Sequence, residues 1–150
     1  MGLFNIIWFV FFGWWQAFVY LVSAVFFAIT IIGIPLAKSL LNLAKLIAFP
    51  FGKEIVRETD LKGVENVSTV RRIGGIIINL MWFPIGLFLS ITHIITGIFA
   101  FFTIIGIPVG IVLVRMGKFL LFPIGAKIVS KKEAYAVAVT NEIEKRKVEE

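Results

Sequence analysis

The chain has no cysteine, and this absence excludes disulfide bonds and thiolate metal sites. Charge is also scarce, at 16% of 150 residues, whereas soluble domains carry about a quarter. Two stretches, 1–37 and 73–114, contain no Asp, Glu, Lys or Arg. Either one exceeds the roughly 20 residues that cross a bilayer. Because a small soluble fold cannot bury 59% apolar residues, we expect an integral membrane protein.

The sequence also lacks the residue sets that catalysis needs. His93 is the only histidine, so no zinc set can form, and no nucleophile is paired with a base. We therefore expect no enzyme, no cofactor, no bound metal and no nucleic-acid partner. The first apolar run has neither a basic start nor a small-residue cleavage site, so we expect it to stay in the membrane rather than to act as a signal peptide.

A motif that occurs twice is the most specific feature present. Thr30-Ile-Ile-Gly-Ile-Pro35 recurs letter for letter at 103–108, an offset of 73 residues. Phe49-Pro-Phe-Gly52 recurs with one change as Phe122-Pro-Ile-Gly125 at the same offset, whereas Asn5-x-x-Trp recurs at 79–82 with an offset of 74. Chance apolar matches do not explain paired Gly, Pro, Thr, Asn and Trp positions. The sequence therefore predicts two tandem copies of one unit.

Each copy is expected to contain a membrane helix, a break at Gly-Ile-Pro and a second helix. Proline lacks an amide donor and restricts the residue before it, so the helices should end near Ile32 and Ile105. We expect bends near Gly13 and near Pro84 and Gly86. The stretch 36–51 is only about 24 Å long as a helix. The sequence leaves open whether it and 109–122 span the membrane or lie in its interface, with each copy then a re-entrant hairpin.

The expected fold is an all-α integral membrane protein with two tandem parallel repeats and about four membrane-crossing or re-entrant helices. Short polar segments at 53–57 and 127–130 are expected to form strands, with pairing between them left open. The expected parts are repeat 1 (3–56), a linker (57–72), repeat 2 (73–129) and a tail (130–150). Linker and tail are both rich in Lys and Arg, so both should be cytoplasmic, as should both termini.

Polar residues within the apolar helices are the candidate functional groups. Most are basic, and they occupy one face of the second helix of each copy: Lys38, Asn42 and Lys45, then Arg115 and Lys118. Cations at membrane depth usually face an interior, so this stripe predicts an anion-facing pore or cavity. The alternative is that these helices lie near the interface, where long side chains reach phosphate headgroups.

Other polar residues have a packing and a functional interpretation. Asn5, Asn79 and His93 are predicted to hydrogen-bond between helices, or else to line a permeation path. At the helix breaks (Thr30, Gly33, Pro35, Thr103, Gly106, Pro108), the threonine hydroxyls are expected to bond to carbonyls that proline frees. If those carbonyls instead face water, they could coordinate ions.

The paired Gly-Ile-Pro motifs, each followed by a Pro-x-Gly turn, and the paired Asn-x-x-Trp entries resemble the YccF family, the inner membrane component domain. The resemblance covers about residues 3–129. It implies a small multi-pass protein of the bacterial inner membrane, and it implies no catalytic residue and no substrate.

Two functional classes therefore remain as expectations. The first is an ion-permeable channel or transport element, expected to be a homo-oligomer because four short helices leave little room for a path in one subunit. The second is a non-conducting scaffold, sensor or accessory subunit. In both, the expected partners are anionic lipid headgroups and further copies of the chain, with small ions as the permeants of the first.

Overall fold

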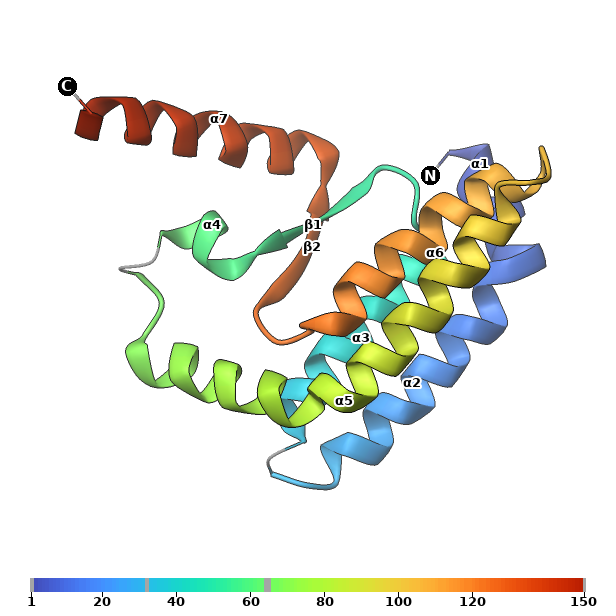
Figure 1. Ribbon diagram of the computed structural model, residues 1–150, viewed down its shortest axis with the longest axis horizontal. Helices are drawn as coiled ribbons and strands as arrows, with labels where there is room; N and C mark the ends of the chain where they lie inside the picture. Colours follow the sequence, from blue (N-terminus) through green and yellow to red (C-terminus); the bar gives the residue numbers. More distant parts are fainter. Residues whose placement is uncertain (1, 32, 64–65, 150) are drawn as a thin grey trace.

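The computed structural model describes residues 2–31, 33–63 and 66–149 (Figure 1). In chain order its elements are α1 (Leu3–Trp8), the π-helix η1 (Phe9–Gly13), α2 (Trp14–Ala28), α3 (Ile34–Ala48), β1 (Lys53–Arg57), α4 (Glu58–Lys62), α5 (Thr69–Ala100), α6 (Gly106–Leu121), β2 (Ala126–Ser130) and α7 (Lys131–Glu149). The chain is mostly helical, as expected, with a small sheet.

Two helical hairpins form the apolar part of the molecule, α2 with α3 and α5 with α6 (Figure 1). The fully buried side chains of the core come mainly from α3 and α6, among them Leu43, Ile47, Met116 and Leu120. By contrast, α2 and α5 expose large apolar side chains, such as Phe18 at 61% and Phe88 at 72%. Two helical stretches, Leu3–Ala28 and Thr69–Ala100, are long and apolar enough to cross a membrane.

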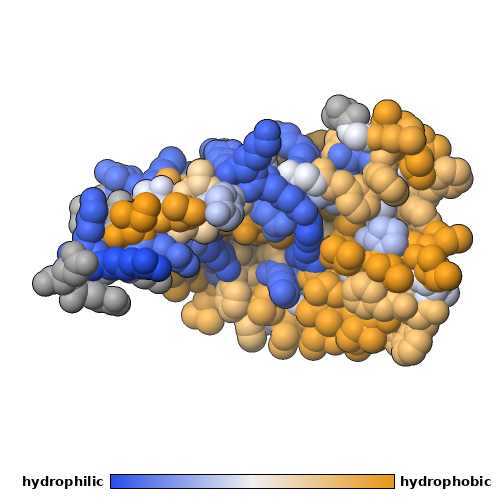
Figure 2. Space-filling view, turned by 90° about the horizontal axis from the view of Figure 1, so that it is seen from above, coloured by the Kyte–Doolittle hydropathy of each residue, from blue (hydrophilic) through white to orange (hydrophobic). Residues whose placement is uncertain are grey.

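Polar and apolar surfaces are separated in space. Figure 2 shows hydrophilic residues gathered at one end of the molecule, where α7 lies, and hydrophobic residues at the other. An exterior with so large a contiguous apolar area matches a protein whose apolar end is solvated by lipid rather than by water.

Both helix breaks use their threonine in the same way. The Thr30 hydroxyl donates to the Phe27 carbonyl at 3.1 Å and accepts the Gly33 amide at 3.1 Å. Thr103 likewise donates to the carbonyl three residues before it at 3.2 Å and accepts the Gly106 amide at 3.0 Å. The hydroxyls thus satisfy backbone groups where the α-helical ladder stops.

The expected helix ends near Ile32 and Ile105 are wrong by four and five residues. In the structure α2 ends at Ala28 and α5 at Ala100. The reason is that the Thr30 and Thr103 amides bond to the carbonyls three residues back, a tighter turn that closes each helix before the proline is reached.

An asparagine holds each Phe-Pro-x-Gly turn. The Asn5 side-chain amide donates to the Phe51 carbonyl at 3.0 Å and accepts the Phe51 amide at 3.0 Å. Asn79 makes the same two bonds to Ile124, both at 3.0 Å. One side chain therefore satisfies both backbone groups of one turn residue, which ties the start of each half to its end.

A tryptophan one turn later makes the next contact. The Trp8 indole donates to the Ile47 carbonyl at 2.7 Å, and the Trp82 indole donates to the Leu120 carbonyl at 2.8 Å. Both indoles are nearly buried, with 4% and 6% exposed. The acceptors lie in the last turns of α3 and α6, where backbone carbonyls have no helical partner.

The π-helix η1 accounts for the change in offset between the paired motifs, from 74 residues at Asn-x-x-Trp to 73 at the motifs that follow. Gly13 follows Trp8 by five residues, whereas Gly86 follows Trp82 by four. In both cases a Cβ on the glycine would meet the indole ring, at 2.9 Å and 2.6 Å. Because a π-helical turn holds one residue more than an α-helical turn, η1 absorbs the extra residue and keeps the indole over the glycine.

The bend expected near Pro84 and Gly86 falls within the long helix α5. Figure 1 shows that the first turns of α5 (green) run in a different direction from its remainder (yellow), and Pro84 lies inside this helix. Proline removes one intrahelical hydrogen bond and clashes with the preceding turn, which is a common cause of such bends.

The two predicted strands are confirmed, and they pair with each other. β1 and β2 are antiparallel, and Ile55 lies opposite Ile128 at the centre of the register. Each strand follows a glycine with positive φ, +88° at Gly52 and +84° at Gly125. Since side chains other than glycine rarely adopt this backbone conformation, the last position of each Phe-Pro-x-Gly motif requires glycine.

The two hairpins run in opposite directions where they meet. In Figure 1, α2 descends from the N-terminus while α5 rises beside it. The Tyr20 hydroxyl and His93 Nε2 are 3.3 Å apart at mid-length, and the Phe27 ring, at the end of α2, packs against Trp82 with centroids 6.0 Å apart. The hairpins thus meet through α2 and α5 at these side chains, in addition to the contact between α3 and α6.

Candidate functional site

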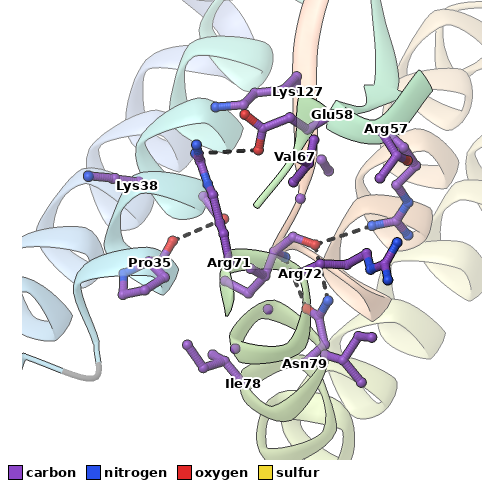
Figure 3. Close-up of a pocket in the computed structure, with 18 of the residues that line it drawn as sticks. Pro35, Lys38, Arg57, Glu58, Val67, Arg71, Arg72, Ile78, Asn79 and Lys127 are labelled. Carbon is purple, nitrogen blue, oxygen red and sulfur yellow. Dashed lines mark hydrogen bonds and ion pairs between the residues drawn. The ribbon is translucent and has the colours of Figure 1, made fainter. Parts of the chain in front are cut away.

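A cavity of about 550 Å³ lies where α3, the start of α5 and the two strands meet (Figure 3). Among the described residues its lining is strongly basic, and the carboxylate present there is that of Glu58. The cationic residues that line it are Lys38, Arg57, Arg71, Arg72 and Lys127. A concave site with this excess of positive charge attracts anions, because its low-dielectric walls focus the field.

Glu58 is the first residue of α4 and is only 6% exposed. Its two carboxylate oxygens lie 3.1 Å from Lys62 Nζ and 3.3 Å from Arg71 Nη2. Burial opposes ionisation of Glu58, but the Lys62 hydrogen bond and the charges of Lys127 and Arg71 outweigh it and hold the pKa of this carboxyl below its ordinary value. The carboxylate is therefore an ionised group inside a basic cluster.

The cations form two groups around the cavity. Figure 3 shows Arg71 and Lys127 beside Glu58, and Arg57 and Arg72 on the opposite side. The Arg57 guanidinium donates to the carbonyls of Phe122 at 2.9 Å and Ile124 at 3.4 Å, which fixes it on the second Phe-Pro-x-Gly turn. An anion between the two groups would be approached by donors from both sides.

The start of α5 borders the cavity and also exposes apolar side chains. Ser68 caps this helix by accepting the Arg71 amide at 3.4 Å. Three apolar residues of α5 that do not line the cavity are exposed, Val70 (84%), Ile73 (51%) and Ile77 (53%). A helix with basic residues on one face and apolar residues on the other suits the boundary between headgroups and acyl chains.

The structure separates the residues of the predicted basic stripe. Lys38 and Asn42 line the basic cavity. Lys45 and Lys118 are exposed elsewhere on α3 and α6. Arg115 contacts strand β1 instead. Its guanidinium lies 3.5 Å from the Glu54 carboxylate and donates to the Lys53 carbonyl at 3.2 Å.

Lys53 has a neighbour from this stripe. Its ammonium donates to the Lys45 carbonyl at 3.0 Å. Burial, and then the positive charge of Lys45, lower the pKa of Lys53 from its ordinary value. Lys53 therefore lies next to another positive charge, as the cations that line the cavity do.

Sequence reasoning missed most of the cavity. The sequence reasoning used four of its cations only as charges that set the membrane topology: Arg57, Arg71, Arg72 and Lys127. It did not consider Glu58. These residues come from a strand, a short helix, the start of α5 and the second strand, so no spacing in the chain reveals that they meet. The usable signal was weaker: the linker and the tail were both basic.

A second, smaller cavity of about 290 Å³ lies between α2 and α5 around Tyr20 and His93. His93 Nδ1 is 2.8 Å from the Leu89 carbonyl oxygen, which only accepts, so Nδ1 carries a proton and donates. A neutral ring then has Nε2 as the acceptor of the Tyr20 hydroxyl at 3.3 Å. This pair joins the two hairpins through a polar contact between apolar helices.

Comparison with known proteins places this architecture in a family. The YccF family model, described as an inner membrane component domain, matches residues 3–53 and 77–126. These two segments contain both Asn-x-x-Trp entries, both Gly-Ile-Pro breaks and both Phe-Pro-x-Gly turns. No solved structure matches the chain.

Two similar proteins are the inner membrane protein YccF of Escherichia coli (strain K12) and that of Shigella flexneri. Each is 31% identical to this chain over 138 residues, which cover 91% of this chain and 93% of the relative. The resemblance carried by the paired motifs is thus confirmed over nearly the whole length, and the chain belongs to the YccF family of inner membrane proteins.

Proposed function

We propose that this protein binds anions at the cytoplasmic face of the inner membrane and, as a homo-oligomer, lets them permeate. The observation that carries the proposal is the basic cavity, whose described lining holds five cationic side chains and the Glu58 carboxylate next to the apolar helices. Such a cavity raises the local concentration of anions and repels cations. An anion path that begins at this cavity would therefore favour anions over cations at its entrance.

The proposed topology places the linker, the tail and both termini in the cytoplasm. The pairing of β1 with β2 supports this, because strands that share backbone hydrogen bonds cannot lie on opposite sides of a membrane. Each half then enters and leaves the membrane on the same side. The many Lys and Arg residues of linker and tail make that side the cytoplasm.

Reporter fusions test this topology. A reporter inserted at Asp60 and another placed after residue 150 should both give the cytoplasmic signature, since the two sites flank the paired strands. A fusion within the Phe101–Ile104 turn between α5 and α6 should give no cytoplasmic signal. A periplasmic signal at Asp60 or at the C-terminus would contradict the proposed arrangement.

We further propose that the chain is a tandem repeat with an internal two-fold axis. Support comes from contacts whose partners are 73 residues apart: Ile55 pairs with Ile128, and Tyr20 bonds to His93. The Asn, Trp and Thr hydrogen bonds also occur in matching pairs. We take this axis to run along the membrane normal, which makes the repeats parallel rather than inverted. Because α2 and α5 run in opposite directions, both helices then lie across this axis rather than along it.

The order of layers along this axis favours the interfacial placement of α3 and α6. Arg115 of α6 bonds to the backbone of β1, and α3 contacts β2, whereas Tyr20 and His93 join α2 to α5. From the cytoplasm inwards the order is sheet, α3 with α6, then α2 with α5. Lys38, Lys45 and Lys118 would then reach headgroup phosphates from α3 and α6.

Permeation is proposed to occur between protomers. The space where α3 meets α6 is filled by side chains with no exposed surface, such as Leu43, Ile47, Met116 and Leu120. A packed apolar core of this kind leaves no water-filled path through it. Several protomers are therefore needed to enclose one.

Flux measurements in liposomes test the function. Vesicles that contain the protein should pass chloride in preference to potassium, and Arg71→Gln with Lys127→Gln should reduce the chloride flux about tenfold by weakening the field at the cavity. Lys132→Gln, an exposed charge on α7, is the matched control and should leave the flux unchanged. Lys45→Gln with Lys118→Gln tests whether those lysines line the anion path or only reach lipid headgroups. A reduced chloride flux would indicate the first role, and an unchanged flux the second.

The second candidate is a non-conducting scaffold, sensor or accessory subunit. The observation that favours it is α7, which extends away from the other helices (Figure 1) and exposes Tyr135, Val139 and Ile143 at successive four-residue steps. Such an apolar stripe on a cytoplasmic helix is typical of a contact surface. Absence of flux for both chloride and potassium, with the protein correctly inserted, would favour this candidate.

A further inference from the structure

We infer that the basic cavity is a site for a phosphate group, in which Glu58 acts as a built-in competing anion. The inference rests on the proposed function, since it names the class of anion that the cavity receives. The same chemistry is offered by a phospholipid headgroup and by free phosphate, and the experiment below distinguishes these sources.

The first argument is the surplus of positive charge. Among the described residues, Glu58 forms ion pairs with Lys62 and Arg71. Arg72 and Lys127 line the same cavity without an ion pair in the described part of the chain. A phosphate group carries one or two negative charges and several acceptor oxygens. It can therefore accept hydrogen bonds from Arg72 and Lys127, which the Glu58 carboxylate does not engage.

The second argument is the type and placement of the donors. Arginine presents a planar fork of donors that matches phosphate, and three of the five cations are arginines. Arg57 is held by two backbone carbonyls, and the Arg71 side chain is 60% exposed although it touches Glu58. Arg71 therefore has donors left for a ligand on the side away from the carboxylate.

The third argument is size and surroundings. A cavity of about 550 Å³ falls within the usual range for small-molecule sites, about 300–1,000 Å³. Its lining also includes apolar residues, Val67 and Ile78 among them, and the exposed apolar face of the same α5 segment adjoins it. A phosphate ester that carries an apolar group would thus find suitable contacts for both of its parts.

Glu58 has the position of a competitor. Its buried carboxylate already occupies the Arg71 side of the cluster, near Lys127 (Figure 3). A phosphate that bonds to Arg71 must share or replace this ion pair. Removing the charge of Glu58 should therefore strengthen phosphate binding, whereas removing the charge of Arg71 or Lys127 should weaken it.

The experiment is thermal unfolding of the full chain in a neutral detergent, followed by tryptophan fluorescence. Inorganic phosphate, phosphatidylglycerol and phosphatidylcholine are titrated separately, with sodium chloride at matched ionic strength as the salt control. A ligand that binds the folded state raises Tm saturably, and the midpoint of the titration gives its affinity whatever the starting Tm of the variant. Phosphate or phosphatidylglycerol should raise Tm at concentrations well below those at which chloride acts, and phosphatidylcholine should not raise Tm.

Variants assign the effect to the cavity. Arg71→Gln should weaken binding about tenfold or more, as expected for loss of a charged hydrogen bond. Lys127→Gln should weaken it several-fold and Glu58→Gln should tighten it several-fold, both on the order of one charge interaction at short range. Lys132→Gln, outside the cavity, should bind as the unaltered chain does.

The outcomes separate the sources and the proposals. A response to inorganic phosphate identifies a site for the free anion, and a response to phosphatidylglycerol alone identifies a lipid headgroup site. No saturable response to either, or an unchanged affinity in Arg71→Gln, overturns the inference. The titration involves no transport, so binding without flux would remove only the proposed permeation, and flux without binding would remove only the phosphate site.

Discussion

Replacing Gly33 or Gly106 by alanine should destabilise the protein by about 3 kcal/mol or more, the range of severe overpacking. A Cβ at Gly33 would overlap the Phe27 carbonyl and the Thr30 hydroxyl, and one at Gly106 would overlap the Thr103 hydroxyl and a backbone carbonyl of α5. The overlapped atoms belong to the capped helix ends, so neither can move without breaking the hydrogen bonds that close the helix.

Thermal and denaturant unfolding in detergent would measure this effect. The matched control is Gly74→Ala, because a Cβ at Gly74 meets nothing within 4 Å and the residue lies within α5. That variant should be as stable as the unaltered chain or more stable by about 0.5–1 kcal/mol, since alanine favours a helix over glycine. Unfolding of Gly33→Ala and Gly106→Ala at the unaltered Tm would show that the breaks tolerate a side chain.

Asn79→Leu and Asn5→Leu should each reduce the free energy of unfolding by about 2–5 kcal/mol. Each asparagine bonds to both the amide and the carbonyl of one turn residue, Asn79 to Ile124 and Asn5 to Phe51. All four bonds are 3.0 Å long. Leucine of similar size leaves both part-buried backbone groups without their side-chain partner, and an unsatisfied group costs about 1–3 kcal/mol when it is buried.

Asn141→Leu is the control for this pair. It makes the same substitution on α7, where the side chain forms one exposed bond of 3.4 Å to the Asp60 carbonyl. Its effect should stay within about 0.5 kcal/mol, as for most surface changes. If Asn79→Leu were as mild as Asn141→Leu, the asparagine would not be what holds the turn. A similar loss for Asn5 and Asn79 would also support the proposed tandem repeat.

Much of the local structure followed from the sequence because it depends on near neighbours. Long uncharged runs predicted the outer helices α2 and α5, and Thr-Ile-Ile-Gly-Ile-Pro predicted a break in each half. The prolines themselves did not set the helix ends, since the threonine turn acts before them. The short polar segments that follow the Phe-Pro-x-Gly turns predicted the two strands, although the sequence alone did not decide whether they pair.

The candidate site was far less predictable, since it depends on contacts between distant segments. Lys38 and Asn42 were singled out by helical spacing and do line the cavity. Arg115 was singled out by the same argument, but Glu54 on β1 engages it instead. Spacing along one helix defines which residues share a face, and it does not reveal what that face meets.

By itself the sequence determined that the chain is apolar enough for a membrane, that each long apolar run contains a helix break, and which motifs occur twice. These features depend on composition, periodicity and glycine or proline chemistry, which are local properties. Only the tertiary structure decided that the asparagines and tryptophans bind turn and helix-end carbonyls, and that Arg57, Arg71, Lys127 and Glu58 share one cavity. Those contacts join residues up to about seventy positions apart, and they exist only once the two hairpins and the sheet have packed.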